Sequence, residues 1–435
     1  MITEDAVMRE PEDTIPRHAV ARGGATEQAA RTTFRDVFAI REFRALWAAQ
    51  LLSVVGDQLA RVALTVLVYE RTRSALLAAV TFAVSIVPTF VGGVTLSWLA
   101  DRYPRRAVMI ICDLVRCVLV LVMAIPWMPL SGMVALLFLV TLVGAPFTSA
   151  RAAIYPDVLD GDRYVMGTAV TLTTYQFAQV LGFAVGGAVA EFFGSGRSLV
   201  ADAATFALSA LIVVVWVQRR PPATTEAHGD RAGLHGVFIG VRLVMTRSAL
   251  RTPMLFGWLA SFYYAPEGVV TPLAHTLGGG GAVVGVILAA EALGNTVGAI
   301  VLSRFVAPPT RLRIMGPLAI AACGTLVLFF GRPDLSVTLL ILFASGLCSS
   351  YQLAANAAFV SAAPREQRSQ AFGLAQGGMS LGQGVVMILA GAAADHQAPA
   401  AVIAVCGAIG ALVAVIIAAD WARERRELVG GHSRR

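Results

Sequence analysis

Four ionisable side chains lie near the centres of long apolar segments, where charged groups are rare. They are Asp57, Arg61, Glu267 and Glu291. A charge at the centre of a membrane costs about 2.5 to 3.5 kcal/mol, so residues of this kind usually bind one another, an ion or a proton. A carboxyl group in such a place can take up and release a proton. The sequence therefore predicts a proton-binding site among these four candidates.

Local spacing leaves the role of each residue open. Asp57 and Arg61 lie one turn apart on one face of a helix, which favours an ionised pair. This pair fits a structural role and a proton site equally well. Glu291 has no basic residue within a helical turn, which favours a proton site. For Glu267, two roles agree equally well with the sequence: binding a cationic substrate, and lining a water-filled cavity.

The segments that carry these residues are long enough to cross a lipid bilayer. Of the 435 residues, 57% are hydrophobic and 14% are charged, unlike the composition of a soluble domain. A helix of about 20 apolar residues crosses a hydrocarbon core of roughly 30 Å. The sequence predicts an all-α membrane protein with twelve transmembrane helices: Leu46–Tyr69, Leu76–Ala100, Ala107–Ile125, Met133–Ala153, Val165–Phe193, Leu199–Val217, Pro253–His275, Ala282–Ser303, Leu312–Gly331, Leu335–Ala362, Ala371–Asp395 and Ala398–Trp421.

A polar stretch at residues 218–236 divides these spans into two groups of six. Residues 1–33 lack an apolar segment, which predicts a disordered cytoplasmic tail. The chain should then form an N-terminal six-helix bundle over 34–217, a cytoplasmic linker over 218–250, a C-terminal six-helix bundle over 251–421 and a basic tail over 422–435. The stretch from Phe34 to Arg44 fits a short interfacial helix or a simple extension of the first span.

The two halves resemble each other, as expected of an internal duplication. A shift of 206 residues superposes residues 92–109 on residues 298–315 with several identities. A shift of 204 residues superposes three pairs: Gln179 with Gln383, Gly187 with Gly391, and Glu191 with Asp395. These similar offsets favour two pseudo-symmetric bundles. The two Gln are candidates for lining a cavity, although hydrogen bonding between helices explains them equally well.

All 34 basic residues are Arg, and their distribution predicts an orientation. With twelve spans, and with Arg151 and Arg313 at span ends counted in the adjoining connections, both tails and the even-numbered connections carry 28 Arg, the odd-numbered connections carry four, and the spans carry two. Loops rich in basic residues stay in the cytoplasm. Both termini are therefore expected on the cytoplasmic side of the inner (plasma) membrane. Because the Arg residues spread over one membrane face, nucleic acid is not an expected partner.

The residue types exclude several kinds of chemistry. Without Lys, the chain has neither the P-loop amine that binds phosphate nor a Schiff-base amine. Its five Cys lie in apolar spans and its six His are scattered, so the sequence shows no metal-binding or disulfide pattern. We therefore expect no cofactor, no metal and no enzymatic activity. Asp113 and Arg116 in the third span are interpreted as structural.

The connection between the second and third spans reads SWLADRYPRRAVM and resembles the signature loop of the major facilitator superfamily. Asp101, Arg102, Arg105 and Arg106 match that signature, whereas Ser97 replaces its usual Gly. Acidic side chains bind favourably at the positive N-terminal end of a helix. The resemblance implies a gating loop, in which Asp101 docks on the start of the eleventh span and the Arg residues pair with nearby acids or lipid phosphates.

The resemblance extends from Phe34 to about Trp421. The segments FRALWAAQLLSVVGDQLARVAL, ARAAIYPDVL and REQRSQAFGL are similar to the branch of that superfamily that contains macrolide and enterobactin exporters. This similarity implies the major facilitator fold and proton-coupled efflux of small amphiphilic molecules by alternating access. Expected partners are a small-molecule substrate, protons and the lipid bilayer, with the protein acting as a monomer. An importer or uniporter on the same fold is the alternative, followed by a membrane scaffold without transport.

Three positions depart from the family pattern. The antiporter signature in the fifth span normally carries Gly-Pro, and here Phe183 follows Gly182. The sequence also predicts no buried Arg in the fourth span, where many proton-coupled members carry one. In the second-half copy of the gating loop, Ala307 stands at the position of the Asp. A gating lock of this kind is therefore expected in the first half alone.

The Arg distribution yields a prediction about orientation. Reporter domains fused after Arg435 or inserted within residues 218–236 should both reside in the cytoplasm, because loops rich in Arg are retained there. Green fluorescent protein reports a cytoplasmic position, and alkaline phosphatase reports an exported one. Phosphatase activity at either place would contradict the twelve-span count.

A second prediction concerns the gating loop. Asp101→Asn removes the charge that meets the helix dipole at a cost of about 1 kcal/mol, so the outward-open state should lose population by about fivefold. Labelling of a single Cys at the cytoplasmic mouth should rise. Asp162→Asn, in the next cytoplasmic connection, is the matched control and should leave labelling unchanged. Unchanged labelling and full transport in Asp101→Asn would exclude this role.

Overall fold

In the computed structural model, the described backbone covers residues 33–96, 98–220, 241–242, 244–364 and 367–432. Within these ranges, the structure does not describe the side chains of Val94, Asp101, residues 368–370 and residues 424–432. The predicted tail over 1–33 and most of the predicted linker therefore fall outside the described residues. The contact expected of Asp101 stays a prediction.

The first half of the chain folds into helices that follow the apolar stretches of the sequence. They are α1 (Phe34–Phe38), α2 (Arg41–Thr72), α3 (Ala75–Val84), α4 (Val87–Thr95), α5 (Leu99–Arg102), α6 (Arg105–Met123), α7 (Leu130–Val158), α8 (Asp162–Phe193) and α9 (Ser195–Trp216). The extended backbone of Ile40 separates α1 from α2, and α1 packs against α8. Of the two alternatives for this region, the short separate helix is the observed one.

The second half is also helical wherever it is described. Its elements are α11 (Ser248–Trp258), α12 (Ala260–Tyr263), α13 (Ala265–Gly268), α14 (Val270–Thr276), α15 (Gly281–Phe305), α16 (Pro308–Gly324), the 3-10 helix η1 (Thr325–Gly331), α17 (Leu335–Ser349), α18 (Gln352–Ala362), α19 (Arg368–Ala394) and α20 (Pro399–His432). The described ranges contain no strand, which confirms the prediction of an all-α protein.

Ten segments of the described chain are long and apolar enough to cross a membrane. The third and seventh predicted spans are not among these ten. The third is α6, which is amphipathic because it carries Arg105, Arg106, Asp113 and Arg116. The seventh is the succession α11–α14, which is divided into four short helices. The count of twelve rests on adding these two segments to the ten.

Prolines explain two interruptions of the seventh span. Pro266 and Pro272 lack the backbone N–H, and their rings clash with the carbonyl group four residues earlier in a regular helix. The backbone departs from helical geometry at Tyr264 and at Val269, just before these prolines. Glu267 consequently lies on α13, a four-residue helix between two breaks, and not on a continuous helix as its span assignment implied.

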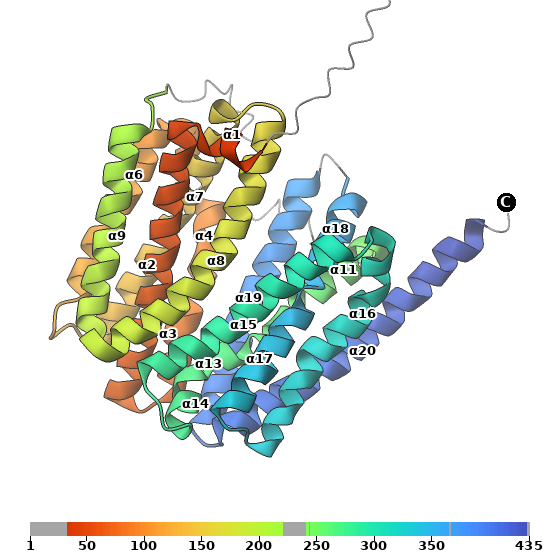
Figure 1. Cartoon of the computed structure of the whole chain (residues 1–435). Helices are drawn as coiled ribbons and strands as arrows, with labels where there is room; N and C mark the ends of the chain where they lie inside the picture. The colour runs from red at the N-terminus through yellow and green to blue at the C-terminus, as the bar shows by residue number, and fades with distance from the viewer. Residues whose placement is uncertain (1–32, 97, 221–240, 243, 365–366, 433–435) are drawn as a thin grey trace, which may run out of the picture.

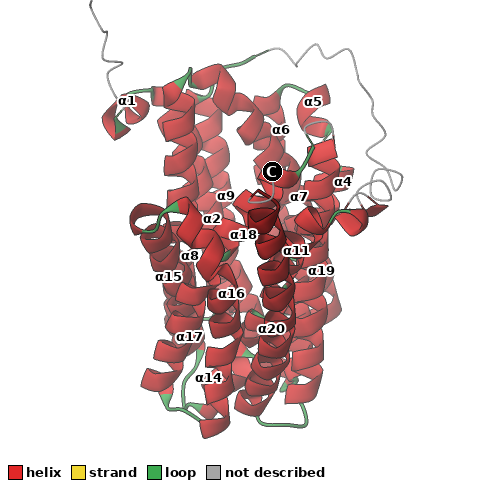
Figure 2. Cartoon of the chain, turned by 90° about the vertical axis from the view of Figure 1, so that its right-hand side faces the viewer, coloured by secondary structure: helices red, strands yellow, loops and turns green. Residues whose placement is uncertain are grey.

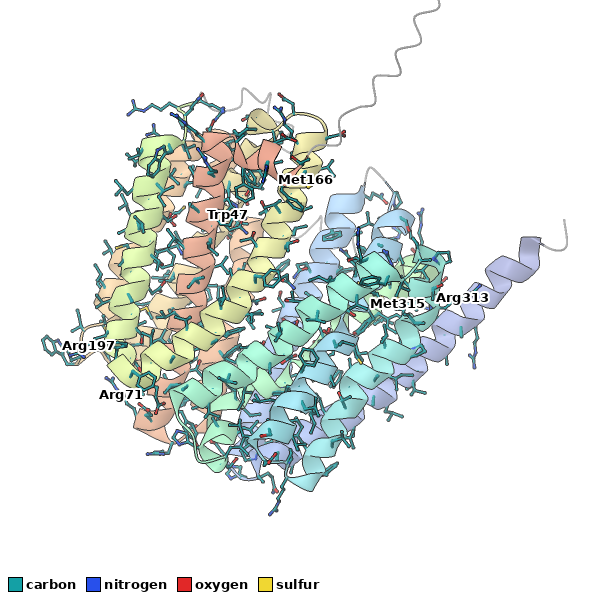
Figure 3. The ribbon with its side chains drawn as sticks, viewed as in Figure 1. Trp47, Arg71, Met166, Arg197, Arg313 and Met315 are labelled. Atoms are coloured by element: carbon teal, nitrogen blue, oxygen red, sulfur yellow. The ribbon has the colours of Figure 1, made fainter. Side chains whose placement is uncertain are left out.

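The helices form two bundles that lie side by side (Figure 1). Helices α2–α9 pack together in one and α11–α20 in the other. The ribbons of the two bundles lean apart toward the end that carries α1, and Figure 2 shows the long helices running along one common direction. Arg71 and Arg197, which belong to the Arg-poor connections, lie at the opposite end (Figure 3).

Two close helix crossings join the bundles: α8 packs on α15, and α3 packs on α19. Both crossings depend on glycine. A Cβ atom built on Gly187 lies 2.5 Å from the carbonyl oxygen of Gly281, and one built on Gly391 lies 2.9 Å from the carbonyl oxygen of Ala75. Small residues allow such backbone contact between membrane helices. Gly187 and Gly391 are one of the pairs that the internal repeat superposes.

An acidic side chain follows each of these glycines by one helical turn and reaches the other bundle. Asp395 accepts hydrogen bonds from the Ser74 hydroxyl at 3.0 Å and from the backbone N–H of Ala75 at 2.5 Å, at the start of α3. Glu191 accepts from the backbone N–H of Ala282 at 3.4 Å, at the start of α15. Carboxylates are stabilised at helix N-termini, so both contacts hold the bundles together. We name Glu191 and Asp395 the paired end caps.

The paired end caps yield a third prediction. Asp395→Asn should weaken the closed end by about 1 kcal/mol or less and raise the population opened there by a few-fold, because the helix dipole of α3 loses its counter-charge. Spin labels at Arg73 and Gln397, in a variant without native Cys, measure the separation across this contact by pulsed electron resonance.

The matched control is Asp334→Asn. Asp334 caps α17 by accepting from the backbone N–H of Val337 at 2.9 Å, within a single bundle. This change should lower stability to a similar extent without altering the distance distribution. Equal distributions in Asp395→Asn and in the unmodified protein would contradict the role of the end cap.

Candidate functional site

The first bundle encloses a cavity of about 190 Å³ that is lined by charged and polar side chains, which we name the charged cavity. Its charged lining residues are Asp57, Arg61, Arg116, Arg151 and Asp202. They come from α2, α6, α7 and α9, so no single stretch of sequence displays the whole group. Such a concentration of charge inside a membrane protein marks a functional site.

Asp57 pairs with Arg116 and not with Arg61. Its carboxylate accepts a hydrogen bond from Nη2 of Arg116 and forms an ion pair with it. Arg61 makes no ion pair within the described part of the chain. The predicted Asp57–Arg61 pair is therefore wrong. Spacing along one helix allowed it, but the guanidinium that reaches Asp57 comes from the facing helix α6.

Arg116 is held from several sides at once. Its Nη1 donates to the hydroxyl oxygen of Ser53 at 2.9 Å and lies 3.8 Å from Oδ1 of Asp113. Its guanidinium carbon lies 4.0 Å from the centroid of the Phe206 ring, a cation–π contact. Ser209 donates to Oδ2 of Asp113 at 2.6 Å. Arg116, which is 3% exposed, thus connects α2, α6 and α9.

Asp202 is a site residue that the sequence prediction did not include. Its side chain is 0% exposed and lines the charged cavity, and its Oδ2 has no hydrogen-bond partner among the described atoms. Asp57 and Arg116 are its electrostatic neighbours. The signal was present in the sequence, because Asp202 lies within the predicted span Leu199–Val217. Applying the rule for intramembrane charges to every span finds it.

Arg151 corrects the expectation that the fourth span lacks a buried Arg. It lies on α7, lines the charged cavity and is half-buried. Tyr155 and Tyr175 are its electrostatic neighbours. Its position near the cytoplasmic end of the predicted span made it look like a loop residue in the sequence.

Arg61 contacts the end of α3 in its own bundle and has an electrostatic neighbour in the second bundle. Its Nη2 lies 3.4 Å from the carbonyl oxygen of Ser85, and its guanidinium carbon lies 5.4 Å from the centroid of the Phe82 ring. It also acts electrostatically on Glu267, which belongs to the other half of the chain. The fold therefore brings two of the predicted candidates together across the bundle interface.

Glu267 and Glu291 form a pair of neighbouring carboxyl groups at this interface. Glu291 on α15 is 5% exposed, and its Oε1 has no hydrogen-bond partner among the described atoms. Tyr264 lies within electrostatic range of both carboxyls, and Tyr175 reaches Glu267 and Arg61 from the first bundle. Arg61, Glu267 and Glu291 thus belong to one group, whereas Asp57 belongs to the Arg116 group.

A larger cavity of about 420 Å³ lies mainly against the second bundle, and we name it the amide cavity. Within the described chain, none of its lining residues is charged. Its lining combines amide side chains with aromatic and methionine side chains: Gln176, Asn295, Gln352, Asn356 and Gln376, with Tyr264, Phe359, Phe372, Met254 and Met379. Tyr264 lines this cavity and is also an electrostatic neighbour of both carboxyl groups.

Gln176 is the residue of the first bundle that reaches the amide cavity. Its Nε2 donates to Oδ1 of Asn295 at 3.0 Å, and Nδ2 of Asn295 donates to the Ser349 hydroxyl at 2.7 Å. Gln179 and Gln383, the predicted lining residues, line neither of the two cavities described here. Gln176 lies three residues before Gln179 on α8, so the two side chains leave the helix in different directions. Spacing in the sequence does not show which of the two lines a cavity.

The Arg residues of the gating loop hold the ends of neighbouring helices. Nη1 of Arg105 donates to the carbonyl oxygen of Ala153 at 2.8 Å and pairs with Asp157 at 2.9 Å. Nη2 of Arg106 donates to the carbonyl oxygen of Val214 at 2.5 Å, near the end of α9. Cations are stabilised at helix C-termini. Arg105 thus pairs with an acid as expected, and Arg102 is exposed.

Comparison with characterised proteins gives one relative of known activity. Macrolide efflux protein A of Streptococcus pyogenes is 26% identical over 244 residues, which make up 53% of this chain and 58% of that protein. The same protein from a serotype M6 strain gives the same values. The match thus spans little more than half the length of the curated relative.

Solved structures of transporters share the fold. Peptide transporter POT in complex with alafosfalin gives a TM-score of 0.72 at 14% identity, over 90% of this chain and 96% of that one. Nucleoside transporter NupG gives 0.68 at 16% identity, over 87% and 99%. A bacterial homologue of the human lysosomal transporter Spinster, inward-facing and occupied, gives 0.64 at 15%, over 88% and 96%.

Family assignment rests on the match over most of the chain. The model described as Major Facilitator Superfamily matches residues 46–334 and 267–432, two regions that overlap. This match, the helical architecture and the shared fold agree with one another. The chain therefore belongs to the major facilitator superfamily of membrane transporters.

Proposed function

We propose that this transporter exports small amphiphilic molecules, of the drug, antibiotic or siderophore-like kind, in exchange for protons. The observation that carries the proposal is the link between the uncharged amide cavity and the carboxyl groups of Glu267 and Glu291. Tyr264 lines the cavity and is an electrostatic neighbour of both carboxyl groups, and Asn295, which also lines it, lies one helical turn after Glu291 on α15. One site suits an organic substrate and the adjacent site suits a proton. The relative named macrolide efflux protein A supports the direction of transport.

The lining of the amide cavity supports the substrate class. Amide side chains donate and accept hydrogen bonds, and aromatic and methionine side chains pack against apolar surface of varied shape. A volume of about 420 Å³ lies within the range of pockets that hold drug-sized ligands. Because no described lining residue is charged, the cavity favours molecules whose polar groups are neutral where they bind.

Proton coupling follows from the cost of charge at the bundle interface. Glu291 is buried without a hydrogen-bond donor on Oε1, and Glu267 is its neighbour, so two ionised carboxylates there repel each other. A bound proton removes this repulsion. One proton moving through about 150 mV yields roughly 3.5 kcal/mol, enough for a gradient of a few hundredfold.

The arrangement of the bundles fits alternating access. The paired end caps close the end that carries the Arg-poor connections, and the bundles lean apart at the other end. With both termini cytoplasmic, as the Arg distribution predicts, this conformation is open to the cytoplasm. In the opposite state, the gating loop around Asp101 is the element that closes the cytoplasmic end.

Amide substitutions at the carboxyl pair test the proposal. Glu267→Gln and Glu291→Gln keep side-chain shape and remove titration, so at least one should abolish uphill export while exchange of substrate down its gradient persists. Export of a radiolabelled macrolide from cells is measured with and without a protonophore. Faster accumulation on uncoupling in the unmodified protein identifies an exporter, whereas slower accumulation indicates an importer.

Asp57→Asn serves as the comparison variant. If Asp57 acts chiefly as the partner of Arg116, this change should lower expression or thermal stability instead of selectively uncoupling transport, because it leaves a buried guanidinium without its counter-ion. Retention of uphill, protonophore-sensitive export in both glutamate variants would place the proton site elsewhere.

A further inference from the structure

We propose that Asp202 is a second proton-binding carboxyl of this transporter, located inside the first bundle and separate from the Glu267–Glu291 pair. This inference deepens the proposed function and rests on it for its role in transport. The binding of the proton itself is a property of the folded chain and can be measured without a substrate.

The number of charges around Arg116 requires a further cation. Asp57, Asp113 and Asp202 all act electrostatically on this one guanidinium. Asp113, Arg116 and Asp202 are 0%, 3% and 0% exposed. The Asp57 side chain is 37% exposed, so the buried charges are those of Asp113, Asp202 and Arg116. With both of these acids ionised, the three groups carry a net charge of about −1, which is costly to bury without compensation. A proton on one of these two acids lowers that excess.

The other cations of the cavity do not compensate Asp202. Arg61 acts on Glu267, and Arg151 lies beside Tyr155 and Tyr175. Neither is among the electrostatic neighbours of Asp202, which are Asp57 and Arg116.

Hydrogen bonds distinguish Asp202 from the two other acids. Asp57 bonds directly to Arg116. Asp113 accepts the Ser209 hydroxyl at 2.6 Å. For Asp202, the one available donor is Thr205, whose hydroxyl lies 2.8 Å from the backbone carbonyl oxygen of Asp202 and 3.4 Å from its Oδ1. A hydroxyl has a single proton, and the shorter contact uses it. Asp202 is therefore the acid whose ionised form is least supported.

A glycine on the neighbouring helix leaves room for this carboxyl group. A Cβ atom built on Gly56 of α2 lies 3.4 Å from the carboxyl carbon of Asp202 and closer still to its Oδ1. The remaining titratable and charged groups near Asp202 are Asp57 on α2 with Asp113, Arg116 and Cys117 on α6. Asp202 lines the charged cavity, whose polar lining gives its proton a route for exchange, and its Oδ2 has no hydrogen-bond partner among the described atoms.

Sharing of Arg116 links this proton to helix movement. While Asp202 holds the proton, Arg116 is free to bond Asp57 and Ser53, both on α2. When Asp202 loses the proton, its carboxylate competes with Asp57 for the same guanidinium. Deprotonation therefore weakens the attachment of α2 to α6. Because α2 also carries Arg61, which acts on Glu267, the two proton sites influence each other through one helix.

Infrared spectroscopy of the purified full-length protein in lipid nanodiscs tests the proposal directly. A protonated carboxyl has a carbonyl stretch that a carboxylate lacks. At neutral pH, the unmodified protein should show such a band that shifts when aspartate is labelled with ¹³C and when water is replaced by D₂O. This measurement needs no variant. A complete absence of an aspartate band at neutral pH would overturn the proposal.

Variants assign the band. Asp202→Asn should abolish it, and Asp113→Asn, equally buried but bonded to Ser209, should leave it in place. Asp57→Asn should move its disappearance to lower pH, because the released Arg116 then stabilises the Asp202 carboxylate. Persistence of the band in Asp202→Asn, or its loss in Asp113→Asn, contradicts the assignment.

Three further outcomes are informative, and the last two separate this inference from the proposed function. A band that appears only when sodium is replaced by potassium means that sodium occupies the site, which overturns a proton on Asp202. If the band is confirmed but export does not respond to a protonophore, the proton site stands and proton-driven export fails. If export is proton-driven and Asp202→Asn changes neither the band nor the pH profile of transport, the second site fails alone.

Discussion

Backbone contact at two glycines is the constraint on which the arrangement of this protein depends. Lipid offers no hydrophobic driving force between helices, so the bundles are joined by close packing and by polar contacts. Gly187 and Gly391 allow that packing, and one turn later Glu191 and Asp395 reach the N-terminal ends of helices in the opposite bundle. Holding the bundles at one end leaves their facing surfaces available for the amide cavity and the carboxyl pair.

Charged side chains inside the bundles are also poorly solvated, so they depend on contacts with one another. Each buried guanidinium satisfies more than one neighbour: Arg116 contacts Asp57, Ser53 and Phe206, and Arg61 serves both the first bundle and Glu267. Within the described bundles, the buried carboxyl groups outnumber the guanidinium groups that contact them, and the proposed uptake of protons lowers that excess of negative charge.

The sequence predicted features that depend on one helix at a time. Apolar length located the spans, and the repeat paired Glu191 with Asp395 before their contacts were known. Features that depend on two helices were missed: the partner of Asp57 comes from α6, and which of Gln176 and Gln179 meets a cavity depends on helix rotation. Asp202, by contrast, depends on one helix: it is an acidic residue within the predicted span Leu199–Val217, so the cost of intramembrane charge marks it as a candidate. Breaks at Tyr264 and Val269 follow from prolines that the hydropathy pattern does not register.

The geometry of the end caps has a consequence for how such a chain can arise. The fifth span of the first half contacts the eighth, and the eleventh contacts the second, so each half supplies one glycine-acid turn and one receiving helix end. That is the pattern of an isologous dimer, in which a single surface is complementary to itself. The interface between the halves therefore has the form that two copies of one six-helix unit would make, because each copy would supply both the glycine-acid turn and the receiving helix end.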